Sequence, residues 1–270
     1  MNTSAFRLAI AACLLATAFA SAACSSSSSA TEGDDTSELT AADNEVQNTF
    51  VQANDALDAG QWSRAARLYA QVIDADPDRW DAHMNQGIAL MRDHEFADAT
   101  ESFEMALRHG GDAEPTVYFN LGNLYQERGL YEKAIDAYRN SMAVAGGLDY
   151  ETLLNISACF TFLNAHDEAR QTVDRAFELD PDDPRAYLTL GILKHSDNRL
   201  DEALEIFDQV TSTHPDLGGA HYNRGFILMR MEENEEAIAA FETYLDVEPE
   251  GPYVTQSESH IQTIQNRLDR

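Results

Sequence analysis

Basic residues are scarce in this chain of 270 residues. Lysine and arginine together number 18, against 47 aspartate and glutamate residues, so the formal net charge is −29. A charge of this sign repels the phosphate backbone of nucleic acids and the headgroups of anionic lipids. The composition therefore predicts no nucleic-acid partner and no electrostatic docking on a membrane. Two roles for the excess acid stay open, which are solvation of exposed helix faces and docking of a basic partner.

Cysteine is also rare, with 3 residues in the whole chain. Cys13 lies in an N-terminal apolar segment that is expected to be removed, and Cys24 is expected to carry a lipid, as described below. Cys159 is then left without a partner for a disulfide. We therefore expect no intramolecular disulfide in the mature chain. Cys159 lies in the middle of a predicted helix, where a small buried apolar residue is expected rather than a nucleophile.

Motifs that carry catalytic or metal chemistry are missing as well. The 8 histidines show no metal-binding spacing with a nearby carboxylate, and there is no Gly-rich phosphate loop, nucleophile elbow or paired-cysteine motif. The sequence therefore predicts no metal, no cofactor and no enzymatic activity. His83 and His221 fall at the same place in a repeated pattern described below, where packing is the expected role.

The N-terminus carries the pattern of an export signal. Arg7 is the single charge that precedes an apolar stretch from Leu8 to Ala20, which is too short to span a membrane. Small residues and then Cys24 follow, and this arrangement resembles the lipobox of bacterial lipoproteins, with Ser21 at the place of the usual leucine. We expect residues 1–23 to be a signal peptide and Cys24 to carry the lipid. The alternative is an ordinary signal-peptidase cut after an Ala-x-Ala sequence, without lipid.

The segment after Cys24 is polar and has almost nothing to bury. Residues 25–39 are mainly serine, threonine, glycine and acidic residues, so residues 24–42 are expected to form a disordered tether. Ser25, in place of the aspartate that retains lipoproteins at the inner membrane, favours the outer membrane. The expected location is the bacterial cell envelope, with the protein attached by lipid and facing the periplasm.

A spaced pattern returns six times in the rest of the chain. Its small residue falls at positions 53, 87, 122, 157, 191 and 225, which are steps of 34 or 35 residues. Such a period is typical of helical hairpins that stack on their neighbours. The pattern predicts an all-α, right-handed solenoid of six hairpins over residues 43–252 and a capping helix over residues 253–270. The cap is expected to cover the last hairpin with Val254, Ile261, Ile264 and Leu268.

Two details of the hairpins follow from the pattern. Gly122 and Ala134 are expected on opposite arms of one hairpin, where small residues let two helices approach closely. The two steps of 35 residues coincide with the pairs Gly110-Gly111 and Gly146-Gly147, so the extra residue is expected in those two loops.

The clearest copy has Tyr118, Leu121, Gly122, Tyr125, Ala134 and Tyr138. With the prolines that end several copies, this resembles the tetratricopeptide repeat family. The resemblance implies that the first helix of each hairpin lines a peptide-binding groove. Carried onto this chain, the groove residues are Met84, Asn85, Ile88, Met91, Phe119, Asn120, Asn123, Leu154, Asn155, Leu188, Ile192, Tyr222, Asn223 and Phe226.

Apolar walls with a row of carboxamides suit a peptide ligand, since asparagine both donates to and accepts from a peptide backbone. The alternative is that these asparagines are only a common feature of the family and that some of the residues pack between helices. Family members that clamp a terminal carboxylate have lysine or arginine in the groove, whereas here the matching places include Asp81, Glu127 and Glu151. We therefore expect no carboxylate clamp.

The expected function is that of a non-enzymatic scaffold in the envelope, which binds an apolar segment of a partner protein. A lipoprotein with six repeats is similar in architecture to the pilotin family of type IV pili, and this implies an outer-membrane secretin as partner. Alternatives are an adaptor for peptidoglycan enzymes, an adaptor for β-barrel insertion machinery, and a secreted enzyme with an unrecognised site. The predicted contact with the membrane is through the lipid anchor alone.

Overall fold

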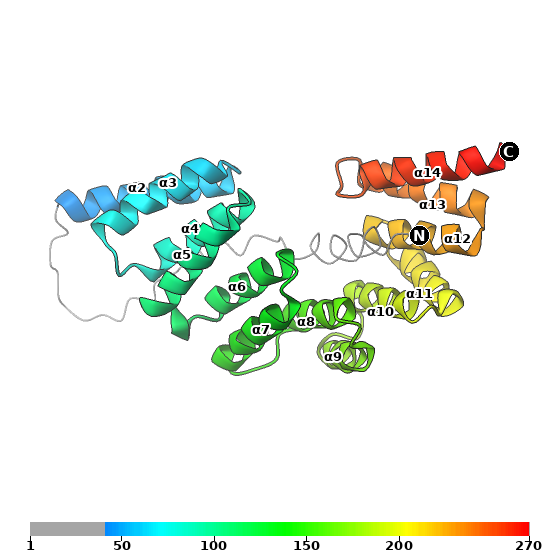
Figure 1. The fold of residues 1–270 in the computed structure, drawn as a ribbon, viewed down its shortest axis with the longest axis horizontal. Helices are drawn as coiled ribbons and strands as arrows, with labels where there is room; N and C mark the ends of the chain where they lie inside the picture. Colours follow the sequence, from blue (N-terminus) through cyan, green and yellow to red (C-terminus); the bar gives the residue numbers. More distant parts are fainter. Residues whose placement is uncertain (1–40, 270) are drawn as a thin grey trace. The chain divides into compact units, whose positions relative to one another are not determined.

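The computed structural model describes residues 41–269 of the chain (Figure 1). These residues form 13 α-helices and one short 3-10 helix, so the all-α prediction is confirmed. The expected signal peptide, the expected lipidation site Cys24 and all but the end of the expected tether lie outside the described residues. Within the described part, the helices group into two compact units, residues 41–148 and residues 149–269.

The first unit contains three helical hairpins. Each hairpin pairs two consecutive helices, which pack closely against each other. The pairs are α2 (Ala41–Asp58) with α3 (Trp62–Ala75), α4 (Trp80–Arg92) with α5 (Phe96–Arg108), and α6 (Pro115–Glu127) with α7 (Tyr131–Ala145). The 3-10 helix η1 (Gly111–Ala113) lies between α5 and α6.

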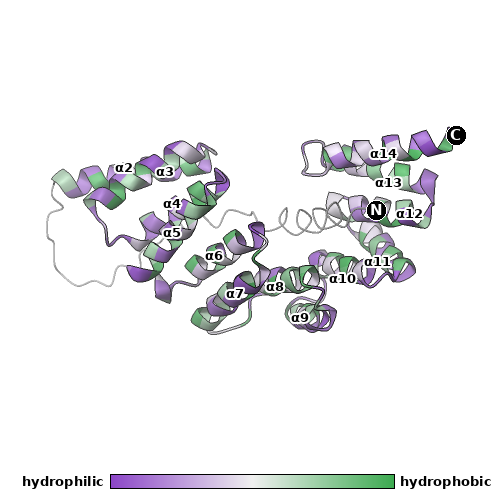
Figure 2. Cartoon of the chain, in the orientation of Figure 1, coloured by the Kyte–Doolittle hydropathy of each residue, from purple (hydrophilic) through white to green (hydrophobic). Residues whose placement is uncertain are grey.

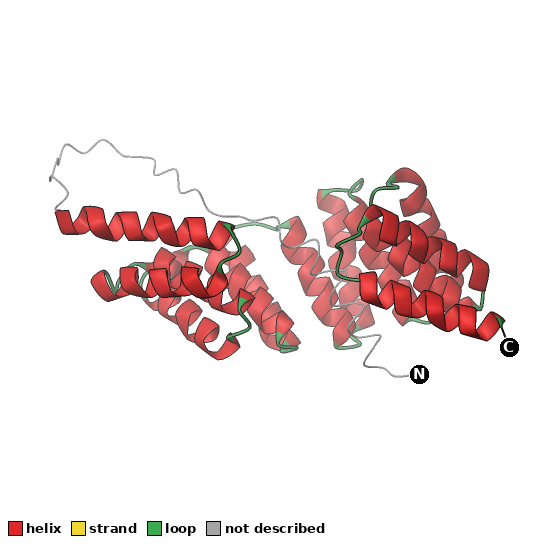
Figure 3. Cartoon of the chain, turned by 90° about the horizontal axis from the view of Figure 1, so that it is seen from above, coloured by secondary structure: helices red, strands yellow, loops and turns green. Residues whose placement is uncertain are grey.

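The second unit repeats this arrangement and adds a single helix (Figure 3). Its hairpins are α8 (Tyr150–Phe162) with α9 (His166–Leu179), α10 (Pro184–Ser196) with α11 (Leu200–Thr213), and α12 (Gly218–Met231) with α13 (Asn234–Val247). The last helix, α14 (Val254–Leu268), packs against α13. Sequential hairpin packing of this kind is that of a tetratricopeptide solenoid.

In the four repeats whose small residue is glycine, this residue lies under an aromatic ring of the second helix in the hairpin. A Cβ atom on Gly122 would lie 2.5 Å from the ring of Tyr138, a distance that real side chains do not tolerate. Ala134, the other small residue of this hairpin, is completely buried. The close approach therefore joins the Gly122 backbone to an aromatic ring rather than to a second small residue.

The fourth hairpin keeps the contact with a different pair of residues. Ser157 takes the place of glycine, and the smaller Val173 takes the place of the aromatic ring. The Ser157 hydroxyl donates a hydrogen bond of 3.1 Å to the carbonyl of Ala169, so this buried polar group is satisfied. Ser157 and Val173 are both completely buried.

Amphipathic helices account for the core. Figure 2 shows helices that carry both hydrophilic and hydrophobic residues, as expected where one side packs and the other meets water. In the first unit, Tyr69 and Phe103 are completely buried, and in the second unit so are Phe241 and Tyr244.

The two longer repeats differ in where the additional residue lies. The helix α5 has 13 residues and is followed by Gly110, which has a positive φ of 105°, and by η1, so this loop is longer, as predicted. The helix α7 instead has 15 residues and ends at Gly146, with a φ of 74°. The loop prediction is therefore wrong for the Gly146 copy, where the extra residue lengthens the helix.

The capping helix covers less with its apolar side than the sequence suggested. Ile264 is completely buried, whereas Leu268 in the final turn is 54% exposed. The expectation for Leu268 is wrong because the covered stripe of α14 ends one turn earlier. No helix within residues 41–269 has the length and apolar character needed to cross a membrane.

Candidate functional site

The predicted groove residues of the first unit divide into core and surface. Met84 and Met91 of α4 belong to the hydrophobic core, together with Phe103 and Leu124. Asn123 of α6 is buried as well, and its Oδ1 lies 2.7 Å from the hydroxyl of Tyr138, which donates to it. The other four predicted residues are half-buried, and they are Asn85, Ile88, Phe119 and Asn120.

The predicted residues of the second unit lie on three neighbouring helices. The helix α10 contacts both α8 and α12, so the inner helices of this unit form one continuous surface. The apolar residues predicted for this surface are buried, except Phe226, which is half-buried. They are Leu154 of α8, Leu188 and Ile192 of α10, and Tyr222 and Phe226 of α12.

The four asparagines that recur two residues before the small residue differ in their hydrogen bonding. The amide nitrogens of Asn120 and Asn223 donate to carbonyls one helical turn earlier, at 2.9 and 2.7 Å. The amide nitrogen of Asn85 reaches the Oδ1 of Asn54 at 3.4 Å. Asn155 is 3% exposed, and its Nδ2 meets no acceptor in the described part of the chain. A buried donor in that state costs free energy until an acceptor arrives.

Charged residues of the first unit meet at the ends of α4 and α6. The Nδ1 of His94 lies 3.7 Å from Oε1 of Glu127. Burial raises the pKa of the Glu127 carboxyl above its usual range, and the nearby His94 and Arg92 oppose that shift. Sequence reasoning noted Glu127 as an acidic residue but missed its pairing, since the partners come from different repeats.

Arg185 begins the inner surface of the second unit and is already neutralised. Its Nη2 lies 2.7 Å from Oδ2 of Asp183, and its guanidinium lies 5.1 Å from the centre of the Tyr150 ring. Burial would raise the pKa of Asp183, but hydrogen bonds from Arg185 outweigh it and hold that pKa below its usual value. Arg185 is thus occupied by an internal carboxylate.

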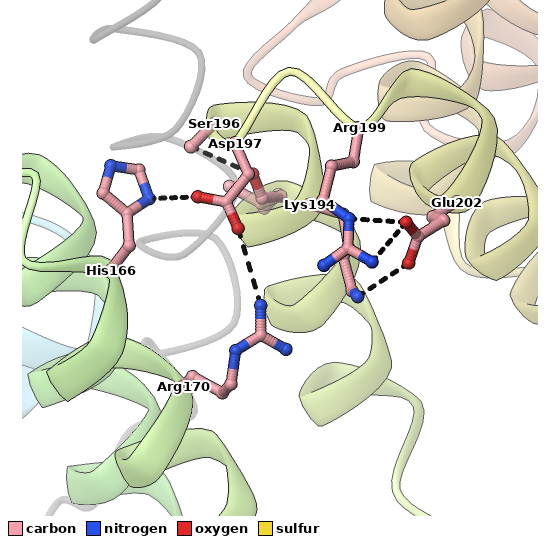
Figure 4. A network of polar contacts seen from close by, with 8 residues as sticks. His166, Arg170, Lys194, Ser196, Asp197, Arg199 and Glu202 are labelled. Carbon is pink, nitrogen blue, oxygen red and sulfur yellow. Dashed lines mark hydrogen bonds and ion pairs between the residues drawn. The ribbon is translucent and has the colours of Figure 1, made fainter.

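A polar network joins two hairpins of the second unit. Figure 4 shows Asp197, at the end of α10, between His166 and Arg170 of α9. The Nδ1 of His166 lies 2.8 Å from Oδ1 of Asp197, and the Nη2 of Arg170 lies 3.5 Å from Oδ2. Lys194 and Arg199 both reach Glu202 at the start of α11. These contacts fix neighbouring helices and leave no free group poised for chemistry among the residues drawn.

The remaining reactive side chains have packing roles. The Nε2 atoms of His83 and His221 lie 2.9 and 3.0 Å from the carbonyls of Pro77 and Pro215, so each ring fixes the preceding turn. Cys159 is completely buried, and burial raises the pKa of its thiol. Within residues 41–269, no three His, Cys, Asp or Glu side chains lie together in a way that could hold a metal ion.

Comparison with known families gives a consistent result along the chain. The tetratricopeptide repeat matches residues 50–115, 113–182, 163–218 and 218–250. Among curated proteins, the CTR9 homolog of Arabidopsis thaliana is 28% identical over 194 residues, which cover 66% of this chain. The match spans 17% of that protein, so the chain corresponds to a small part of this relative.

Two solved structures share the fold over most of the chain. PilW, a type IV pilus biogenesis factor, has a TM-score of 0.66 at 16% identity, covering 82% of this chain and 98% of PilW. PilF of Pseudomonas aeruginosa has a TM-score of 0.60 at 15% identity, covering 84% of this chain and 100% of PilF. At these identities the likeness concerns the fold alone. With hairpins, glycine–aromatic contacts and matches from residue 50 to residue 250, the chain belongs to the tetratricopeptide repeat family of protein–protein interaction scaffolds.

Proposed function

We propose that this protein is a non-enzymatic scaffold that binds an extended, apolar segment of a partner protein along α8, α10 and α12. The observation that carries the proposal is the Nδ2 of Asn155, a buried donor without an acceptor among the described residues. Its equivalents Asn120 and Asn223 donate within their own helices. Asn155 is therefore the asparagine of this row that is free to serve a ligand.

The neighbouring side chains suit the same ligand. Leu154, Leu188 and Ile192 are apolar residues of α8 and α10 that are buried in the protein without a ligand. A backbone carbonyl of an extended segment would accept from Asn155, while its side chains would pack on those residues. The backbone bond gives affinity, and the apolar contacts give selectivity for hydrophobic side chains.

The partner we propose is a secretin subunit at the outer membrane. The fold is shared with PilW, which is a type IV pilus biogenesis factor, and with PilF. A β-rich subunit must keep its exposed strand edges covered until it assembles, and a groove for extended chain suits that task. The net charge of −29 would limit unspecific contact with anionic lipid.

Attachment to the envelope through Cys24 completes the proposal. Because stable anchoring needs more than one acyl chain, we expect the multiple chains of a bacterial lipoprotein there. Cys24→Ala should move the protein from the membrane fraction to the soluble fraction and leave its helical circular dichroism unchanged. Retention of the variant in the membrane pellet, or an unmodified N-terminus by mass spectrometry, would overturn the anchor.

Capture of partners from detergent-solubilised envelopes tests the binding site. The wild-type chain should recover the secretin, Asn155→Ala should recover several-fold less, and Asn120→Ala should behave as the wild type. Asn155→Ala removes a donor that lacks an acceptor but also leaves a small cavity, since Asn155 is 3% exposed, so capture is measured at a temperature where circular dichroism shows both variants folded. Equal capture by both variants would exclude Asn155 as a ligand contact. Capture of a peptidoglycan enzyme or of β-barrel insertion machinery instead would identify this protein as an adaptor for that partner rather than for a secretin.

A further inference from the structure

The last helix covers one end of the proposed binding surface. The ring of Tyr253, just before α14, stacks on Tyr222 at 4.2 Å between ring centres. The His260 ring of α14 lies 5.7 Å from Phe226 and 5.2 Å from Phe241. Tyr222 and Phe226 are both residues of the predicted groove, so α14 occupies part of the surface assigned to the ligand.

The helix α14 carries two polar groups in poor surroundings. Ser257 is completely buried, and its Oγ finds no hydrogen-bond partner in the described part of the chain. His260 is half-buried against aromatic rings, and this burial lowers the pKa of its imidazole. Both groups would be better solvated if α14 moved away. The cap is thus held less firmly than a wholly apolar helix would be.

The groups around His260 offer no compensating charge. The helix α12 contributes Tyr222 and Phe226, and α13 contributes Phe241, while Glu258 of α14 itself is exposed. Beyond Phe226 lies His195 of α10, at 5.4 Å between ring centres, and Arg230 of α12 acts on that histidine. Burial is the cause of the lowered pKa of His260, with no contribution from a carboxylate in the described residues.

We propose that α14 is a displaceable cap, which covers Tyr222 and Phe226 in the empty protein and is released when the pH falls. Release would extend the apolar inner surface by two aromatic rings, so ligand binding and cap docking would compete for the same residues. The competition rests on the proposed function, whereas the release of α14 does not require any ligand.

The sign of the pH effect follows from the burial of His260. The docked helix holds the neutral imidazole, and a released helix lets it take up a proton at its ordinary pKa of 6.5. Docking is therefore strongest above pH 6.5 and weakens below it, by at most about tenfold in the docking equilibrium per pH unit. Attraction between a protonated imidazole and the ring faces opposes this trend, but the lowered pKa means that burial dominates.

Hydrogen exchange of the full chain tests the release without a partner. The protection factors of α14 amides should fall several-fold between pH 7.5 and pH 5.5, while those of α12 stay within twofold. His260→Phe, which cannot take up a proton, should remove the fall in α14, and His260→Gln serves the same purpose should the larger ring disturb the fold. Ser257→Ala should raise the protection of α14 at both pH values.

A fluorescent probe of exposed apolar surface gives an independent reading. Binding of the dye ANS should increase from pH 7.5 to pH 5.5 with the wild-type chain and stay constant with His260→Phe. Unchanged α14 protection in the wild type, or an equal fall in His260→Phe, would overturn the proposal. If α14 is released at low pH but the protein captures no partner, the proposal for α14 is kept and the proposed binding function is rejected.

Discussion

The two units share one packing scheme and differ in the chemistry of their inner helices. Five residues after the small residue, the first unit has Asp58, Arg92 and Glu127, whereas the second has Phe162, Ser196 and Arg230. At the position one residue after it, two of the three residues in the first unit are asparagines, whereas all three in the second unit are apolar. They are Asn54, Ile88 and Asn123 in the first unit, and Ala158, Ile192 and Phe226 in the second. The hairpin contacts are kept because they hold each repeat together. The inner positions are free to vary, so they can serve a ligand.

Asparagine shows the contrast most clearly. In the first unit, Asn54 and Asn123 accept hydrogen bonds from the buried hydroxyls of Tyr69 and Tyr138, so amides there stabilise the hairpins. In the second unit, Asn155 has a donor to spare. Asn223 of the second unit is satisfied within its own helix, so the difference rests on Asn155, which makes the second unit the better candidate for ligand binding.

The largest expected effect is the disruption of one hairpin in the first unit. Gly122→Leu would drive a side chain into the ring of Tyr138, because even a Cβ atom would lie 2.5 Å from it. We expect a loss of about 3 kcal/mol in the free energy of unfolding. Urea unfolding followed by tryptophan fluorescence measures it, since Trp62 and Trp80 both lie in this unit.

Gly147→Leu is the matched control for that substitution. A Cβ atom there would meet nothing within 4 Å, so the change should stay within about 0.5 kcal/mol. Equal destabilisation by both substitutions would show that the contact with Tyr138 is not the cause. The protection of α12 against hydrogen exchange should be kept in both variants, because repeats interact mainly with their neighbours.

The second prediction concerns opposite responses of the two units to acid. Burial, helped by Arg230, lowers the pKa of His195 in the second unit to about 4. This unit is therefore most stable above pH 6.5 and should lose about 2 kcal/mol by pH 5, as the unfolded chain takes up the proton. Glu127 acts in the opposite direction in the first unit, since a raised carboxyl pKa favours the folded state as the pH falls.

Unfolding at several pH values separates these two responses. Hydrogen exchange in α10 and α11 reports on the second unit, and tryptophan fluorescence reports on the first. His195→Leu should reduce the acid response of α10 and α11 and leave that of the first unit unchanged, while the part that comes from His260 in α14 remains. An unchanged slope in His195→Leu would assign the response of α10 and α11 to another group.

The sequence was sufficient for the fold because the contacts of a hairpin are local and repeated. Gly122 and Tyr138 are 16 positions apart, and the same spacing returns in Gly191 and Phe207, so the period alone identifies the partners. The pair Ser157 and Val173 keeps this spacing with other residue types.

The candidate site was less accessible to sequence reasoning. Whether the amide of an asparagine is satisfied depends on its rotamer and on the neighbouring repeat, and nothing in the sequence separates Asn120 from Asn155. The cover of Tyr222 by Tyr253 was also missed, because the capping helix does not continue the repeat pattern. Met84 and Met91 follow the pattern of groove residues, yet they lie in the core of the first unit.

The smallest expected effect compares equivalent contacts at the ends of two inner helices. Asp93 and Asp197 each follow the first helix of a hairpin. Asp93 accepts a hydrogen bond from the neutral hydroxyl of Ser63, whereas Asp197 lies 2.8 Å from the imidazole of His166 and also faces Arg170. The second unit thus joins its hairpins with groups that carry or can take up charge, and the first does so with a neutral donor.

Salt distinguishes the two contacts. His166→Ala and Ser63→Ala should each lower the free energy of unfolding of their unit by about 0.5 kcal/mol, because both contacts are partly exposed. Raising the salt concentration should shrink the loss from His166→Ala and change that from Ser63→Ala less, because dissolved ions screen an ion pair more than a hydrogen bond from a neutral hydroxyl. Equal salt dependence in the two variants would mean that the His166–Asp197 contact acts as a neutral hydrogen bond, and the electrostatic difference between the units would then be confined to their inner surfaces.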